Sequence, residues 1–223
     1  MQLLIGAFLG CLVGAGVWIV CGYFNARYQP EPVSTPAEDN ASPLRRQKGL
    51  AAPRAVLLQA AFAVLGAYLW WRASNPTQVV AALVLTGLLA CISLVDFQVR
   101  RIPNALCLAL VGWALVQMLW LGQPRPASAA LGMLIAGVLF FVVALAGRGA
   151  MGAGDVKLAA ALGAILGYPL VFSALACGII VGGIAALVLI VARRVGRKGY
   201  MAYGPYLALG SWMVWMGAMK FWP

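Results

Sequence analysis

Residues 128–147 read SAALGMLIAGVLFFVVALAG, an apolar stretch of twenty residues without a charged side chain. About 20 such residues in an α-helix cross the hydrocarbon core of a bilayer, so this stretch predicts a transmembrane helix. The same criterion, applied outward along the chain, gives eight apolar segments. They cover approximately residues 2–24, 55–71, 78–96, 105–122, 128–147, 156–167, 169–192 and 204–221. The sequence therefore predicts an all-α integral membrane protein, a polytopic bundle of about eight transmembrane helices.

The sixth segment, residues 156–167, is the weakest of the eight. A helix of about a dozen residues rises only about 18 Å, whereas the hydrocarbon core is about 30 Å thick. The segment is therefore either a half-span or joined to the next segment through Tyr168-Pro169.

Composition supports the membrane assignment and excludes several kinds of enzyme. Of the 223 residues, 64% are hydrophobic and 9% are charged, whereas soluble domains carry about 25% charged residues. The chain contains no histidine, which excludes a Ser–His dyad and a His-ligated zinc protease. Its five cysteines form no C-x-x-C pair, so neither a zinc site nor a disulfide framework is indicated.

The net charge of +11 is explained by membrane topology and does not indicate a nucleic-acid partner. With the N-terminus outside, three basic residues, Arg72, Arg125 and Lys220, fall outside, and thirteen fall in cytoplasmic loops. The thirteen are Arg27, Arg45, Arg46, Lys48, Arg54, Arg100, Arg101, Arg148, Lys157, Arg193, Arg194, Arg197 and Lys198. This positive-inside bias predicts the orientation of the bundle.

Two of the five acidic residues, Asp96 and Asp155, lie alone at the ends of apolar segments. In the predicted topology both emerge at the cytoplasmic face. A charged carboxylate within a span costs about 2.5–3.5 kcal/mol, so each is a functional candidate. Two carboxyls held close together can share one proton, and one then acts as general base on a water while the other acts as general acid. This chemistry needs no histidine, metal or cofactor.

Each aspartate also has an ordinary structural interpretation. Asp155 follows a Gly-Ala-Gly sequence and precedes a helical run, so it is a candidate helix N-cap. Asp96 is four residues before Arg100, a spacing that permits an ion pair within one helix. That interpretation is less favourable for Asp96, because a carboxylate at a helix C-terminal end opposes the helix dipole.

Three short motifs place these aspartates in a wider pattern. Residues 152–158 read Gly-Ala-Gly-Asp-Val-Lys-Leu, Asp96 is followed by Ile-Pro-Asn at 102–104, and residues 203–206 read Tyr-Gly-Pro-Tyr. In this order they resemble the G-x-G-D-x-K-L signature, the other catalytic aspartate motif and the aromatic-Gly-Pro-aromatic motif of the type IV prepilin peptidases. The resemblance covers roughly residues 80–221.

The resemblance implies that Asp96 and Asp155 are the catalytic pair of a membrane aspartic endopeptidase. Such an enzyme removes the basic leader peptide from type IV prepilins or type II secretion pseudopilins, at the cytoplasmic face of the bacterial inner membrane. The implied partners are the prepilin or pseudopilin and membrane lipid, and the peptidase needs no cofactor. Candidates for supporting the active site and the substrate are Gly152, Gly154, Lys157, Pro103, Asn104, Gly204 and Pro205. The glycines lack a Cβ and so let backbone approach the dyad closely.

The N-terminal region departs from that family. We expect residues 1–77 to form N-terminal spans with a cytoplasmic loop at 25–54, and residues 78–223 to form the peptidase domain. The loop is polar up to Pro43, which predicts disorder, and basic from Leu44 on, which predicts contact with anionic headgroups. Bifunctional members carry two C-x-x-C pairs there and methylate the new N-terminus with S-adenosylmethionine. This loop contains no cysteine, so the sequence leaves open whether the chain is a peptidase alone or also a methyltransferase.

Two other functions are compatible with paired membrane carboxylates. A transporter or proton carrier would place them near the bilayer midplane in pseudo-symmetric halves, and a non-catalytic assembly factor would use both aspartates structurally. Both aspartates lie at one face and no internal repeat is present, which favours the peptidase.

Overall fold

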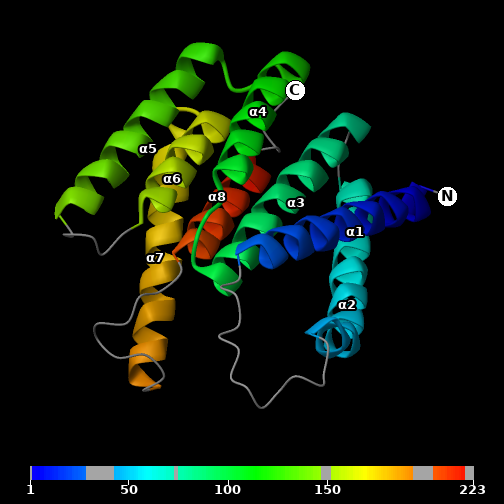
Figure 1. Cartoon of the computed structure of the whole chain (residues 1–223). Helices are drawn as coiled ribbons and strands as arrows, with labels where there is room; N and C mark the ends of the chain where they lie inside the picture. The colour runs from blue at the N-terminus through cyan, green and yellow to red at the C-terminus, as the bar shows by residue number, and fades with distance from the viewer. Residues whose placement is uncertain (1, 29–42, 73–74, 147–151, 193–202, 219–223) are drawn as a thin grey trace. The chain divides into compact units, whose positions relative to one another are not determined.

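The computed structural model describes residues 2–28, 43–72, 75–146, 152–192 and 203–218. Within these ranges the backbone forms eight α-helices and no strand (Figure 1). They are α1 (Gln2–Tyr28), α2 (Pro43–Arg72), α3 (Pro76–Val99), α4 (Asn104–Leu121), α5 (Pro126–Ala146), α6 (Ala153–Leu166), α7 (Leu170–Val191) and α8 (Gly204–Ala218). Each helix covers one of the eight predicted segments. The predicted all-α fold of a polytopic membrane protein is confirmed.

Five of these helices are long and apolar enough to cross a membrane, as judged over the described residues. They are α1, α3, α4, α5 and α7. In α2 the apolar part is shorter and covers Ala55–Trp71. The helix itself begins earlier, at Pro43, and includes the basic stretch that follows. The predicted disorder of residues 29–42 lies outside the described residues.

The sixth segment forms a separate short helix, so the alternative that it continues into the next segment is wrong. The 14 residues of α6 rise about 21 Å, less than the thickness of a hydrocarbon core. Gly167 ends the helix with a φ of 68°, a left-handed conformation that glycine adopts without a Cβ clash. Its N–H donates to the Gly163 carbonyl at 2.8 Å, and α7 begins at Leu170.

The chain divides into two compact units, Met1–Gly87 and Leu88–Pro223. In the first unit α1 and α2 pack closely. A Cβ on Gly6 of α1 would overlap Trp70 and the Gly66 carbonyl of α2, so these backbones approach more closely than side chains would allow, as is common between membrane helices. The boundary falls within α3, whose last residues belong to the second unit. The functional division at residue 77, predicted from the motifs, stays a prediction.

In the second unit α6 forms the centre. It packs against α4, α5, α7 and α8, and most of its residues from Leu158 to Leu166 are buried. Figure 1 shows α6 between α5 and α4. The crossing with α5 is glycine on glycine, since a Cβ on Gly163 would meet the backbone carbonyl group of Gly132. This arrangement fixes the helix that carries Asp155.

The C-terminal end of α6 is also held by polar contacts. The buried Gln117 side chain of α4 donates from Nε2 to the carbonyls of Ile165 and Gln123, each at 3.2 Å. Ser128 of α5 donates its hydroxyl to the Tyr168 carbonyl at 2.7 Å. The bond to Ile165 satisfies a carbonyl that the end of α6 leaves without an intrahelical partner, and the bond to Tyr168 holds the connection that follows, so α6 is anchored at the end opposite to Asp155.

Candidate active site

Asp96 lies in the last turn of α3, and its side chain is only 4% exposed. Its neighbours Val95 and Ile92 are fully buried. The backbone N–H of Gly204, the first residue of α8, donates to Asp96 Oδ2 at 3.1 Å. The N-terminus of α8 therefore supplies a donor and a favourable dipole to a carboxylate that the C-terminal end of α3 disfavours.

Asp155 is the third residue of α6, at the opposite end from the polar anchor. The N-cap of this helix is Gly152, in an extended conformation, and no side chain caps the helix. The N-cap interpretation of Asp155 is therefore wrong, because the helix begins two residues before the aspartate. A carboxylate in the first turn of a helix is still stabilised by the dipole.

The two carboxyls interact electrostatically. Burial raises the pKa of Asp155 to about 6, and the nearby charge of Asp96 is the second cause, opposed by a backbone hydrogen bond with Gly152. Like charges placed close together resist ionising together. The structure thus brings into one electrostatic site two aspartates that are 59 positions apart in the sequence.

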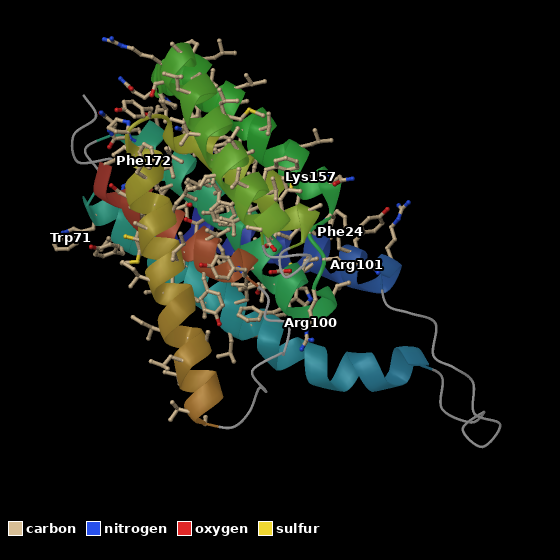
Figure 2. The ribbon with its side chains drawn as sticks, turned by 90° about the vertical axis from the view of Figure 1, so that its left-hand side faces the viewer. Phe24, Trp71, Arg100, Arg101, Lys157 and Phe172 are labelled. Carbon is tan, nitrogen blue, oxygen red and sulfur yellow. The ribbon has the colours of Figure 1, made fainter. Side chains whose placement is uncertain are left out.

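The ion-pair interpretation of Asp96 is not supported. Helix α3 ends at Val99, and Arg100 leaves it with a φ of 54°. Between the described side chains of Asp96 and Arg100 no ion pair is present; their contact is a backbone hydrogen bond from Arg100 N to the Asp96 carbonyl at 2.9 Å. Arg100, Arg101 and Lys157 are exposed side chains of this unit, as Figure 2 shows.

The two glycines next to the aspartates approach other groups closely. A Cβ on Gly204 would lie 2.7 Å from Asp96 Oδ2 and 3.3 Å from Ile102 Cδ1. A Cβ on Gly154 would lie 3.2 Å from Ile102 Cβ. Gly152 is less constrained, with Asp155 Oδ2 at 3.6 Å from its hypothetical Cβ. The predicted close approach of backbone to the dyad is thus present at Gly204.

The remaining predicted residues lie at the start of α4, near the start of α6 and at the start of α8. Pro103 is the N-cap of α4 with a φ of −62°, and Pro205 lies in the first turn of α8, where proline costs no hydrogen bond. Lys157 Nζ donates to Asn104 Oδ1 at 2.9 Å, an exposed bond that joins α6 to α4. All seven supporting candidates therefore lie at the helix ends that surround the two aspartates.

Two residues at this site were not among the predicted site residues. Ile102 contacts both close-packed glycines. Tyr203 packs its ring on α7, where a Cβ on Gly182 would lie 3.0 Å from Tyr203 Cε2. Burial and, second, the charge of Asp155 raise the pKa of the Tyr203 phenol. Both residues belong to the quoted motifs, which was the only sequence signal for them.

No group of three or more His, Cys, Asp or Glu side chains able to hold a metal ion occurs in the described part of the chain. The five cysteines lie on the apolar helices. The arrangement offers two carboxyls, backbone N–H groups and a phenol.

Part of the chain that carries this site is similar to a known family. Residues 83–187, which include both aspartates, match the type IV leader peptidase family. This part of the chain is similar to that family. The match begins within α3 and ends within α7, so Gly204 and Pro205 lie beyond it.

Three curated relatives that match this region are each named prepilin leader peptidase/N-methyltransferase. The protein from Neisseria gonorrhoeae is 34% identical over 146 residues, which is 63% of this chain and 49% of the relative. The protein from Aeromonas salmonicida is 31% identical over 149 residues, 64% of this chain and 51% of the relative. The protein from Pseudomonas aeruginosa is 29% identical over 170 residues, 70% and 56% of the two chains. The chain spans about half the length of the curated relatives it matches, and no solved structure matches it significantly.

Proposed function

We propose that this chain is a membrane aspartic endopeptidase that removes the basic leader from type IV prepilins or type II secretion pseudopilins. The observation that carries the proposal is the electrostatic pairing of Asp96 with Asp155 inside the segment that matches the leader peptidase family. Prepilin leaders are the substrates named for the relatives.

The proposed chemistry uses both carboxyls. The ionised carboxylate takes a proton from a water, whose oxygen attacks the scissile carbonyl carbon, while the protonated carboxyl gives its proton to the carbonyl oxygen. When the tetrahedral intermediate collapses, the C–N bond breaks, the leaving nitrogen takes up a proton from one carboxyl of the dyad, and a hydroxyl of the intermediate returns a proton to the other carboxylate. The pairing of Asp96 with Asp155 supports this division, because the charge of one carboxyl favours retention of a proton by the other.

The proposal places the dyad at the cytoplasmic face of a bacterial inner membrane. The thirteen basic residues assigned to inner loops favour this orientation. Reporter fusions in residues 25–54, 97–104 and 193–200 should read cytoplasmic, and fusions near 73–76 and 123–126 should read external. An external 97–104 loop would contradict the orientation.

The substrate would lie among the helices with its leader emerging beside the dyad. Cleavage needs extended backbone, because a helical peptide keeps its carbonyl hydrogen-bonded. A glycine at the boundary between the leader and the apolar helix makes local unwinding easier. We propose Gly152 as the position that leaves room for this backbone, because only Asp155 Oδ2 and Gly154 N lie within 4 Å of the Cβ that it lacks.

Methylation of the new N-terminus is the second activity in the names of the relatives. It would require S-adenosylmethionine, and the 25–54 loop of this chain lacks the cysteine pairs of bifunctional members. Peptide cleavage and methylation are separable by product mass, since only methylation with S-adenosylmethionine adds the mass of a methyl group.

The test of the function is incubation of the full chain, in vesicles that contain phosphatidylglycerol, with a panel of prepilins and pseudopilins. We expect cleavage directly after the boundary glycine, identified by mass spectrometry of both products. Replacing this substrate glycine with a bulky residue should block cleavage and leave membrane insertion intact. Cleavage deep within the apolar helix, or equal processing of the bulky variant, would contradict the proposal.

A further inference from the structure

Ile102 lies in the short connection between α3 and α4, six residues after Asp96. It follows Arg100 and Arg101, which are exposed and are labelled in Figure 2. The Ile102 side chain, in contrast, is partly buried. An isoleucine here is held against protein rather than against solvent. Its surroundings are the N-terminus of α6, which carries Asp155, and the N-terminus of α8, whose Gly204 N–H binds Asp96.

On one side Ile102 packs against the start of α6. A Cβ on Gly154 would lie 3.2 Å from Ile102 Cβ and 3.6 Å from both Ile102 Cγ1 and Ile102 N. These distances leave space for the glycine hydrogen and little more. Gly154 directly precedes Asp155, so the contact limits how closely the first turn of α6 approaches the connection.

On the other side the tip of the same side chain packs against the start of α8. A Cβ on Gly204 would lie 3.3 Å from Ile102 Cδ1. The Gly204 N–H is the donor to Asp96 Oδ2. One isoleucine therefore contacts the glycine beside one aspartate and the glycine that binds the other.

Packing is the force available to set the separation of the two carboxyls. Isoleucine is branched at Cβ and stiff at χ1, so it acts as a spacer of fixed length. From these contacts we propose that Ile102 is a positioning residue, which sets the distance between Asp96 and Asp155 by holding Gly154 and Gly204 on opposite sides of its side chain. This inference rests on the proposed peptidase function.

The two sides of the spacer can be removed separately. Ile102→Val deletes Cδ1, which contacts Gly204, and keeps Cβ and Cγ1, which contact Gly154. Ile102→Ala deletes both branches. The matched control is Ile165→Val, the same deletion at the buried far end of α6. It removes core volume without touching the dyad.

We expect Ile102→Val to lower kcat several-fold and Ile102→Ala to lower it about 100-fold, because misplacing reacting groups by about 1 Å has effects of this size. KM should stay within about twofold of the wild type. The bell-shaped pH profile should broaden, because loss of the spacer lets the carboxyls come closer together and split their apparent pKa values more. Ile165→Val should leave kcat and the width of the profile unchanged. Equal behaviour of Ile102→Val and Ile165→Val would overturn the proposal.

A measurement without substrate keeps this inference distinct from the peptidase proposal. The measurement is an experimental structure of Ile102→Ala at a resolution that shows side chains. The distance from Gly204 N to Asp96 Oδ2, which is 3.1 Å in the wild type, should lengthen, and Asp155 should move relative to Asp96. An unchanged site would overturn the positioning role, whether or not the chain cleaves prepilins. If the wild-type chain cleaves no prepilin but the site is displaced in Ile102→Ala, the proposed peptidase function is wrong and the positioning role of Ile102 stands.

Discussion

The second unit contains two kinds of glycine contact that serve different ends. At Gly163 of α6, glycine faces Gly132 of α5, and a Cβ would collide with backbone. At Gly204 of α8, glycine faces the Asp96 carboxylate and the tip of Ile102, and a Cβ would collide with Oδ2. The first contact fixes a helix crossing, whereas the second holds a functional group. The same residue type at the same kind of close approach therefore fixes a helix crossing in one place and holds the proposed catalytic carboxylate in the other.

Gly204→Ala is the sharpest test of the second kind. The new methyl group would lie 2.7 Å from Asp96 Oδ2, so the carboxylate must move and its 3.1 Å bond to the backbone is lost or lengthened. We expect kcat for leader cleavage to fall about 100-fold with little change in the amount of folded protein. Gly112→Ala is the matched control, because nothing lies within 4 Å of the Cβ that it adds. Equal activity of Gly204→Ala and Gly112→Ala would contradict the claim that the contact at Gly204 positions the Asp96 carboxylate.

Gly163→Ala should give the opposite result. Its methyl group would lie 2.6 Å from the Gly132 carbonyl carbon, and the two backbones must separate, at a cost of about 1–3 kcal/mol. We expect lower resistance to thermal unfolding in detergent, while each folded molecule retains its kcat. A loss of kcat without a loss of stability would show that this crossing also tunes the site.

Stability should also respond to the charge of Asp155. Its pKa of about 6 in the folded chain is above the ordinary value of 3.8, so the Asp155 carboxyl holds its proton more tightly in the folded chain than in the unfolded chain. Its contribution to stability is full below the ordinary pKa and is lost as pH rises through about 6. Asp155→Asn should therefore raise the melting temperature relative to the wild type at pH 8 more than at pH 4. A difference between the two proteins that is the same at both pH values would contradict the raised pKa.

The smallest effect is expected at the exposed bond between Lys157 and Asn104. Lys157→Met should weaken cleavage only a few-fold, since exposed charged contacts contribute about 0–1 kcal/mol. Asn104→Ala should have the same effect, and the double variant should lose no more than either single one. Losses that add fully would mean that the two side chains act independently of each other.

Much of this molecule is readable from its sequence, because hydrophobic length and charge placement are local properties. All eight apolar segments became helices, and the motifs at Asp96 and Asp155 lie in the segment that matches the leader peptidase family. The start of α2 at Pro43 was missed because its first turns are polar and give no apolar pattern. The N-cap interpretation of Asp155 failed because Gly152 is the N-cap of α6. The spacer position of Ile102 depends on where residues 154 and 204 meet, which no local pattern contains.

The central claim is that Asp96 and Asp155 act together on the scissile bond, and single replacements test it most directly. Asp96→Asn and Asp155→Asn keep the shape of each side chain and remove its ability to exchange a proton. Each should lower the initial rate of prepilin cleavage by at least about 1,000-fold, with insertion and abundance unchanged. Glu38→Gln, which removes a carboxyl from the 25–54 segment, should retain the wild-type rate. Full activity in either aspartate variant would contradict the account.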